Sequence, residues 1–206
     1  SVFDKHTIIR SEQDLSAGWT ILPRDSWYVK LESPKYTNTQ NAAVYFEDLR
    51  SCIKLIESDA KNPKYRNVKV TINNPGASNK NISLGDPTGQ TSYYDTGEDT
   101  WYIDSGMTIT FDLNGSDLSH LNRRGTYGSE SAGLGSVIEV RNGGSFILQD
   151  SSAAKTGRIV GGCGSLDIDF NGYTGGAGIA VDEGGSLEIQ GGTITGNRNF
   201  ARAQVV

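Results

Sequence analysis

Apolar and polar residues alternate in three short runs in the second half of the chain. Each run begins two residues after a glycine and holds two large apolar residues two positions apart: Phe146/Leu148, Leu166/Ile168 and Leu187/Ile189. This spacing places both side chains on one face of a β-strand. A valine six residues earlier ends a second apolar run in each case. The pattern therefore predicts pairs of short strands joined by a glycine-containing corner.

These runs repeat at a nearly fixed distance. The serine that opens each run recurs as Ser145, Ser165 and Ser186, at spacings of 20 and 21 residues. A weaker copy with the same internal spacing has Thr108 at this position, 37 residues before Ser145. A fixed period is typical of stacked units that bury their apolar faces only against their neighbours. We therefore expect the three runs to form inward columns, with Leu166 between Phe146 and Leu187.

If these copies stack, the residues at their corners also come into register. Gly144, Gly164 and Gly185 share one register position, where we expect a positive φ, which glycine adopts at low cost. A third strand per turn is expected at Ala153, Tyr173 and Ile194. Arg158 occupies an inward position in the middle copy. Because an unpaired buried charge is costly, we expect the Arg158 side chain to stay outside.

Part of the chain resembles a known family. The stretches GSVIEVRNGGSFILQD, GAGIAVDEGGSLEIQGGTITGN and MTITFDLNG resemble the right-handed parallel β-helix repeats of adhesin-like, pectin-lyase-like secreted and surface proteins of anaerobic bacteria. The resemblance covers roughly residues 100–200 and implies an all-β fold, a right-handed parallel β-helix (β-solenoid). It also implies an extracellular or cell-surface location. The superfamily includes pectate lyases, polygalacturonases, phage tailspikes and non-catalytic adhesins, so the fold leaves the function open.

The N-terminal part differs in pattern. Apolar residues at helical spacing, from Val44 to Ile56, predict one helix at about 42–60, capped by Asn41 or Thr39. An open solenoid end needs a cover, so we divide the chain into N-terminal strands with a capping helix (1–62) and a β-helix (63–206). Phe200–Val206 is similar to the first strand of a further turn. We expect this C-terminal edge to be cut from a longer repeat or covered by a partner, either a glycan or another protein chain.

Composition narrows the class of protein. The 206 residues include 26 glycines, as expected for many corners, and the net charge of −5 gives no basic footprint for nucleic acid. The sequence contains no run of 18 apolar residues, so it predicts no membrane-spanning helix. Two cysteines, Cys52 and Cys163, form neither a disulfide framework nor a zinc site by themselves, and we expect both to be free thiols.

One loop combines aromatic and acidic residues in the manner of a glycan-contacting surface. Aromatic rings stack on sugars and carboxylates accept hydroxyl hydrogen bonds, and both lie close together in this loop: Tyr93, Tyr94, Asp95, Glu98, Asp99 and Tyr102. By its register with Ile138 and Ile179, Trp101 should point inward and Tyr102 outward. The competing interpretation is that the tyrosines cover the core.

Catalysis would require clustered carboxylates on the outer face of neighbouring turns. Asp167 and Glu188 share an outward register position, 21 residues apart, but Ile147 occupies the next position of that row. We therefore expect no catalytic residues, no metal site and no cofactor, with calcium considered only for an enzyme of this superfamily. The sequence favours a non-catalytic extracellular module acting in adhesion, glycan binding or structural assembly. The alternative is a polysaccharide lyase or glycoside hydrolase with Asp167 and Glu188 as its acidic pair.

Overall fold

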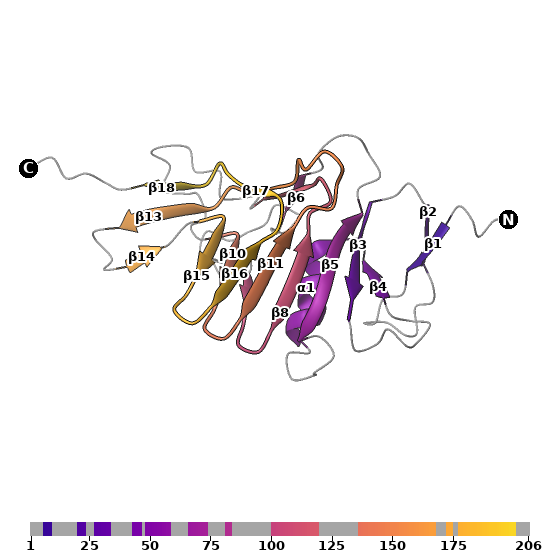
Figure 1. The fold of residues 1–206 in the computed structure, drawn as a ribbon, viewed down its shortest axis with the longest axis horizontal. Coiled ribbons are helices and arrows are strands. Elements are labelled where there is room, and N and C mark those ends of the chain that lie inside the picture. Colours follow the sequence, from indigo (N-terminus) through magenta and orange to yellow (C-terminus); the bar gives the residue numbers. More distant parts are fainter. Residues whose placement is uncertain are drawn as a thin grey trace, which may run out of the picture.

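The structure is a computed structural model of the chain. It describes residues 6–9, 20–23, 27–33, 43–46, 48–58, 66–73, 81–83, 100–119, 136–167, 172–174 and 177–200. In this part of the chain nearly all regular structure is β, with one short helix, which agrees with the expected all-β class (Figure 1). The first elements are β1 (His6–Ile9), β2 (Thr20–Pro23), β3 (Tyr28–Glu32), β4 (Ala43–Phe46), α1 (Leu49–Ser58), β5 (Asn67–Asn73) and β6 (Asn81–Ser83).

Three sheets contain parallel strands that follow one another in a recurring chain order. A trio of strands, one in each sheet, follows another along the chain, and we call each such trio a layer. The six-stranded sheet has the order β16-β11-β8-β5-β3-β4, the four-stranded sheet β17-β12-β9-β6, and the β10 sheet β15-β10-β7. The layers are β7 (Trp101–Ile103), β8 (Thr108–Asp112) and β9 (Asp117–Ser119); β10 (Ile138–Val140), β11 (Ser145–Gln149) and β12 (Arg158–Val160); and β15 (Ile179–Val181), β16 (Ser186–Ile189) and β17 (Thr193–Ile194). They stand side by side in Figure 1.

Apolar residues stack in register through the six-stranded sheet. Val68, Ile109, Phe146 and Leu187 occupy one register position on β5, β8, β11 and β16. Val70, Phe111, Leu148 and Ile189 occupy a second. The members on β5, β8 and β11 are all essentially inaccessible to solvent. In-register stacking of alternate residues thus forms the core, as the two-residue spacing predicts.

The middle copy of the sequence repeat does not belong to these columns. Leu166 lies on β13 (Cys163–Asp167), which pairs with β14 (Gly172–Thr174) and β18 (Arg198–Phe200) in a separate sheet. Ser145 pairs directly with Ser186, 41 residues on, so the prediction of a 20-residue turn is wrong. Val160 likewise pairs with Ser119 rather than with the valines of the β10 sheet. The similar sequence around Ser165 forms another side of the same 41-residue unit.

The third side of each layer also differs from expectation. Its apolar positions are Ile82, Leu118, Ile159 and Ile194, which share one register in the four-stranded sheet. Ile194 was expected on this side. Tyr173, which was also expected there, instead pairs with Leu166 in the antiparallel pair β13–β14, and Ala153 lies in an exposed turn.

The two glycines of the corners at 143–144 and 184–185 are required for different reasons. Gly143 and Gly184 have φ near +80°, one position before Gly144 and Gly185, which were predicted to need it, and Gly106 has the same φ at the equivalent position. The next residue has no positive φ, but a Cβ on Gly144 would lie 2.3 Å from the carbonyl oxygen of Ile103 in the preceding layer. The amide of Gly106 donates to the carbonyl of Gly143, and that of Gly143 to Gly184, each at 2.9 Å. The corner therefore continues the interlayer hydrogen bonding of the strands.

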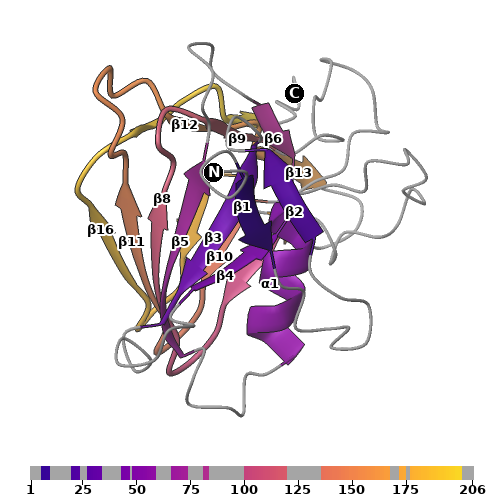
Figure 2. The ribbon, with the colours of Figure 1, turned by 90° about the vertical axis from the view of Figure 1, so that its right-hand side faces the viewer.

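Strands and a helix both cover the N-terminal side of the stack. β3 pairs antiparallel with the edge of β5, and β4 pairs with β3. The predicted helix at 42–60 is therefore wrong over Ala43–Phe46, because Val44 and Phe46 are buried, alternate with half-buried neighbours and face the core as a strand. The helix begins at Leu49, and its N-cap is Asp48, whose carboxylate accepts the amide of Ser51 at 2.7 Å. Figure 2 shows α1 on the side opposite the six-stranded sheet.

Truncating a central column residue tests this register. Changing Phe146, which is fully buried between Ile109 and Leu187, to Ala should lower the free energy of unfolding by about 3–5 kcal/mol. The matched control is Ile147→Ala on the outer face of the same strand, which should cost less than about 1.5 kcal/mol. Urea denaturation measures both. Equal losses would contradict the inward and outward assignment.

Candidate functional site

The predicted glycan-contacting residues lie mostly outside the described part of the chain. Tyr93, Tyr94, Asp95, Glu98 and Asp99 belong to the segment 84–99, which the structure does not describe. Tyr102 is described, and it projects from the outer face of β7 while its neighbours Trp101 and Ile103 are buried, as predicted. Trp101 packs edge-on against Phe111 and Phe146, with ring centroids 5.4 and 5.8 Å apart. The strand is thus fixed by its inward residues.

Three residues gather around Tyr102 at the outer side of the β10 sheet. The guanidinium of Arg141 lies 3.8 Å from the centre of the Tyr102 ring. Arg141 also forms ion pairs with Asp104 at 3.0 Å and with Glu139 at 3.3 Å. We call Tyr102, Asp104, Glu139 and Arg141 the Tyr102 cluster.

Electrostatics within the Tyr102 cluster favour the charged form of Arg141. Partial burial opposes the charge on Arg141, but its hydrogen bonds to Asp104 and Glu139 outweigh this effect and raise the pKa of Arg141. The charges of Asp104 and Arg141 also act on the carboxyl group of Glu57 in α1. Its pKa is raised, first by burial and then by the charge of Asp104, against the lowering effect of Arg141 and other cations. Arg141 lies over one face of the Tyr102 ring, the face that a sugar would need.

The candidate acidic pair is not brought together by the strand register. Glu188 is an exposed residue of β16, as predicted, but its register partner on β11 is Ile147 rather than Asp167. Asp167 pairs with Gly172 on β14, in a different sheet. The expected placement of Asp167 and Glu188 on adjacent strands is therefore wrong, because the residue that pairs with Glu188 lies 41 positions earlier in the chain rather than 21. Glu188 accepts a hydrogen bond from the side-chain amide of Gln190 at 2.8 Å.

Two buried aspartates at the second corner of the layers were missed by the sequence analysis. Asp150 is 3% exposed and accepts the backbone amides of Gly115 at 2.9 Å, Ser152 at 3.0 Å and Gly157 at 2.7 Å. Gly115 belongs to the preceding layer, so one carboxylate joins two layers and both ends of its own loop. The signal available in the sequence is an aspartate directly after a strand and followed by serines, which is typical of an Asx turn.

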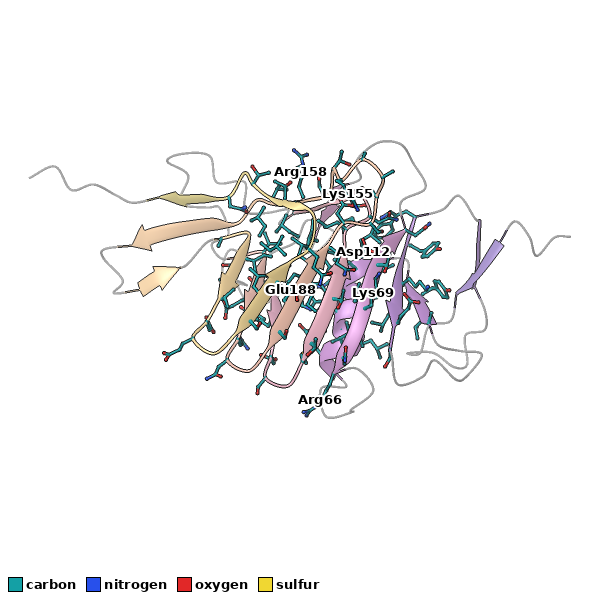
Figure 3. The ribbon with its side chains drawn as sticks, viewed as in Figure 1. Arg66, Lys69, Asp112, Lys155, Arg158 and Glu188 are labelled. Carbon is teal, nitrogen blue, oxygen red and sulfur yellow. The ribbon has the colours of Figure 1, made fainter. Side chains whose placement is uncertain are left out.

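Asp112 has the equivalent role one layer earlier. It is 1% exposed, accepts the amides of Asn114 and of Ser151 in the next layer, and lies 3.3 Å from the Lys69 ammonium group. Figure 3 shows Lys69 and Asp112 on neighbouring strands. Asn114 has a positive φ and donates from its side chain to the carbonyl of Ile72, a layer earlier. These polar groups stabilise the stacking of layers at the corner.

Other predicted residues can be placed briefly. Arg158 is exposed, as expected, and binds Asp117 of the preceding layer, with Nε 3.0 Å from the carboxylate (Figure 3). Cys52 is a free thiol on the buried face of α1, and burial raises its pKa. The side chain of Cys163 lies outside the described residues. In the ranges that the structure describes, no three His, Cys, Asp or Glu side chains are grouped to hold a metal ion, and no helix is long and apolar enough to cross a membrane.

Comparison of the sequence with protein-family models and curated proteins, and with solved structures, gives no match.

Removing the charge of Asp150 should weaken the corner in a pH-dependent way. Burial opposes ionisation, but hydrogen bonds from Ser152 and from the amides of Gly157 and Gly115 outweigh burial and lower the pKa of Asp150. In Asp150→Asn, the new NH2 group would face an N–H donor, and we expect a loss of about 1–3 kcal/mol at pH 7.

The same carboxylate gives this prediction its pH dependence. A lowered pKa means that the stabilisation is present above the unfolded-state carboxyl pKa and is lost as the pH falls through the folded-state pKa. The difference between wild type and Asp150→Asn should therefore shrink as the pH is lowered below about 4. Urea unfolding across this range measures it, with Asp182→Asn at an exposed corner as the control. A difference that stays constant with pH would count against the assigned role.

Proposed function

We propose that this chain is a non-catalytic, extracellular parallel β-helix module that acts in structural assembly at a bacterial surface. In this proposal each layer is part of one turn of a right-handed β-helix of the pectin-lyase-like type. Three parallel sheets in recurring chain order support it, since each turn advances every sheet by one strand. The right hand follows from the general preference of parallel crossover connections.

The observation that carries a structural role is the use of the carboxylates within the layers. Asp112 and Asp150 accept backbone amides across the second corner, and Asp117 holds Arg158 of the next layer. These interactions connect successive layers. Glu188 has an apolar register partner, Ile147, instead of a second acid. Adhesion and glycan binding are compatible with such a module, and Tyr102 is the described residue that a glycan would approach.

Assays for polysaccharide cleavage test the non-catalytic part of the proposal. We expect no product from pectate, xylan or similar polymers incubated with the folded chain, with or without calcium. Reducing-sugar release and the absorbance of unsaturated products are the two readouts, since they separate hydrolysis from lyase chemistry. Reproducible product that disappears in Asp167→Asn or Glu188→Gln, but persists in the control Glu32→Gln, would establish the alternative of a lyase or glycoside hydrolase.

A further inference from the structure

The last layer exposes apolar residues whose equivalents are buried one layer earlier. Val181 is 44% exposed and Ile189 is 53% exposed, whereas their register partners Val140 and Leu148 are each 0% exposed. Leu187 and Ile194 are only partly buried. The described part of the chain thus ends its apolar columns at an open face.

The strands of this layer also have an unpaired edge on the same side among the described strands. Among the strands that the structure describes, β15, β16 and β17 are each the terminal strand of their sheet. A terminal parallel strand presents a row of amide and carbonyl groups that a further strand can pair with. The occupant of this edge must therefore supply extended backbone as well as apolar side chains.

The charge of the last layer restricts the occupant further. Residues 177–197 contain three acids, Asp182, Glu183 and Glu188, and no lysine or arginine. The corner position alternates in charge along the stack, from Asp104 to Arg141 to Asp182. Arg141 binds Asp104 on the preceding layer. Continuation of this alternation places a cation opposite Asp182.

A second copy of the same face fits poorly. Two such edges would bring six carboxylates together at neutral pH. In an antiparallel pairing that sets Leu187 opposite Ile189 of the other copy, Glu188 would oppose its own equivalent, and like charges directly opposed are destabilising.

We propose that the edge formed by β15, β16 and β17 binds a basic, strand-forming protein segment. The segment pairs parallel to β16, adds alternate apolar residues to the columns of Leu187 and Ile189, and places a lysine or arginine next to Asp182. This is recognition by strand addition. The inference rests on the proposed function, since it gives the assembly module its partner chemistry. The sequence analysis expected the partner at Phe200–Val206, of which 201–206 lie outside the described residues. The present proposal places the partner at the preceding layer instead.

A peptide from the chain itself is a suitable probe. The segment Ile138–Gln149, IEVRNGGSFILQ, has the strand spacing and glycine corner of a layer, with arginine at the corner position. The probe carries Gln in place of its glutamate, which makes the peptide basic. We expect the labelled peptide to bind the full chain in a fluorescence anisotropy titration. A peptide with Glu in place of that arginine should bind about fivefold or more weakly, and added salt should reduce this difference.

Variants of the protein locate the site. Asp182→Asn should weaken binding of the arginine peptide about fivefold and leave the glutamate peptide unaffected. Val181→Asp should abolish binding, and the control Glu32→Gln, at the far end of the six-stranded sheet, should not change it. Circular dichroism checks that each variant folds. Should Val181→Asp fail to fold, Ile189→Asp, at an exposed position of the adjacent strand, takes its place.

Three results would overturn the inference. They are no binding to the folded protein, equal binding of both peptides, and self-association in sedimentation equilibrium that Val181→Asp removes, which would make a second copy the occupant. Each of them leaves the non-catalytic proposal standing. Polysaccharide cleavage would overturn that proposal while leaving the docking result unchanged, so the two failures are distinguishable.

Discussion

Parallel backbone pairing in exact register between layers is the constraint on which this structure depends. Phe146 is buried because β8 and β11 place Ile109 beside it, and β16 places Leu187 on its other side. A shift of one residue would turn every inward side chain outward. The glycine pairs follow from the same constraint, because the corner must pass close to the carbonyl of Ile103 without a Cβ at Gly144.

Local alternation predicted much of the core. The inward residues of β8, β11 and β16, the outward position of Tyr102 and the exposed Arg158 all follow from a two-residue period and the cost of burying charge. The length of the repeating unit was not predicted. Gly164-Ser165 has the same local sequence as the other corners, and a local pattern does not specify which distant strand will pair with it. The pairing partner is decided by long-range packing.

The corner aspartates and the helix start show a second limit. The sequence around Asp150 indicates an Asx turn but does not indicate burial, because the burial of Asp150 depends on Gly115, a residue 35 positions away. Ala43–Phe46 fits a helical pattern as well as a strand pattern, and pairing with β3 decides between them. Tyr102 shows the same limit at the candidate site: its outward direction was predictable, but its contact with Arg141 depends on register between β7 and β10.

The two corners of a layer differ in how much their length varies from one layer to the next. The corner before the second strand has four residues in each layer (104–107, 141–144 and 182–185), whereas the next corner has four, eight and three (113–116, 150–157 and 190–192). In the eight-residue corner, Asp150 binds the amides of Ser152 and Gly157, so the ends of the loop are held by one side chain. Residues inserted between Ser152 and Gly157 would therefore lengthen the loop without shifting the register of the strands on either side. This corner is therefore the place where such a scaffold can display a foreign peptide or acquire new surface during evolution, while the glycine corner keeps the spacing of the stack.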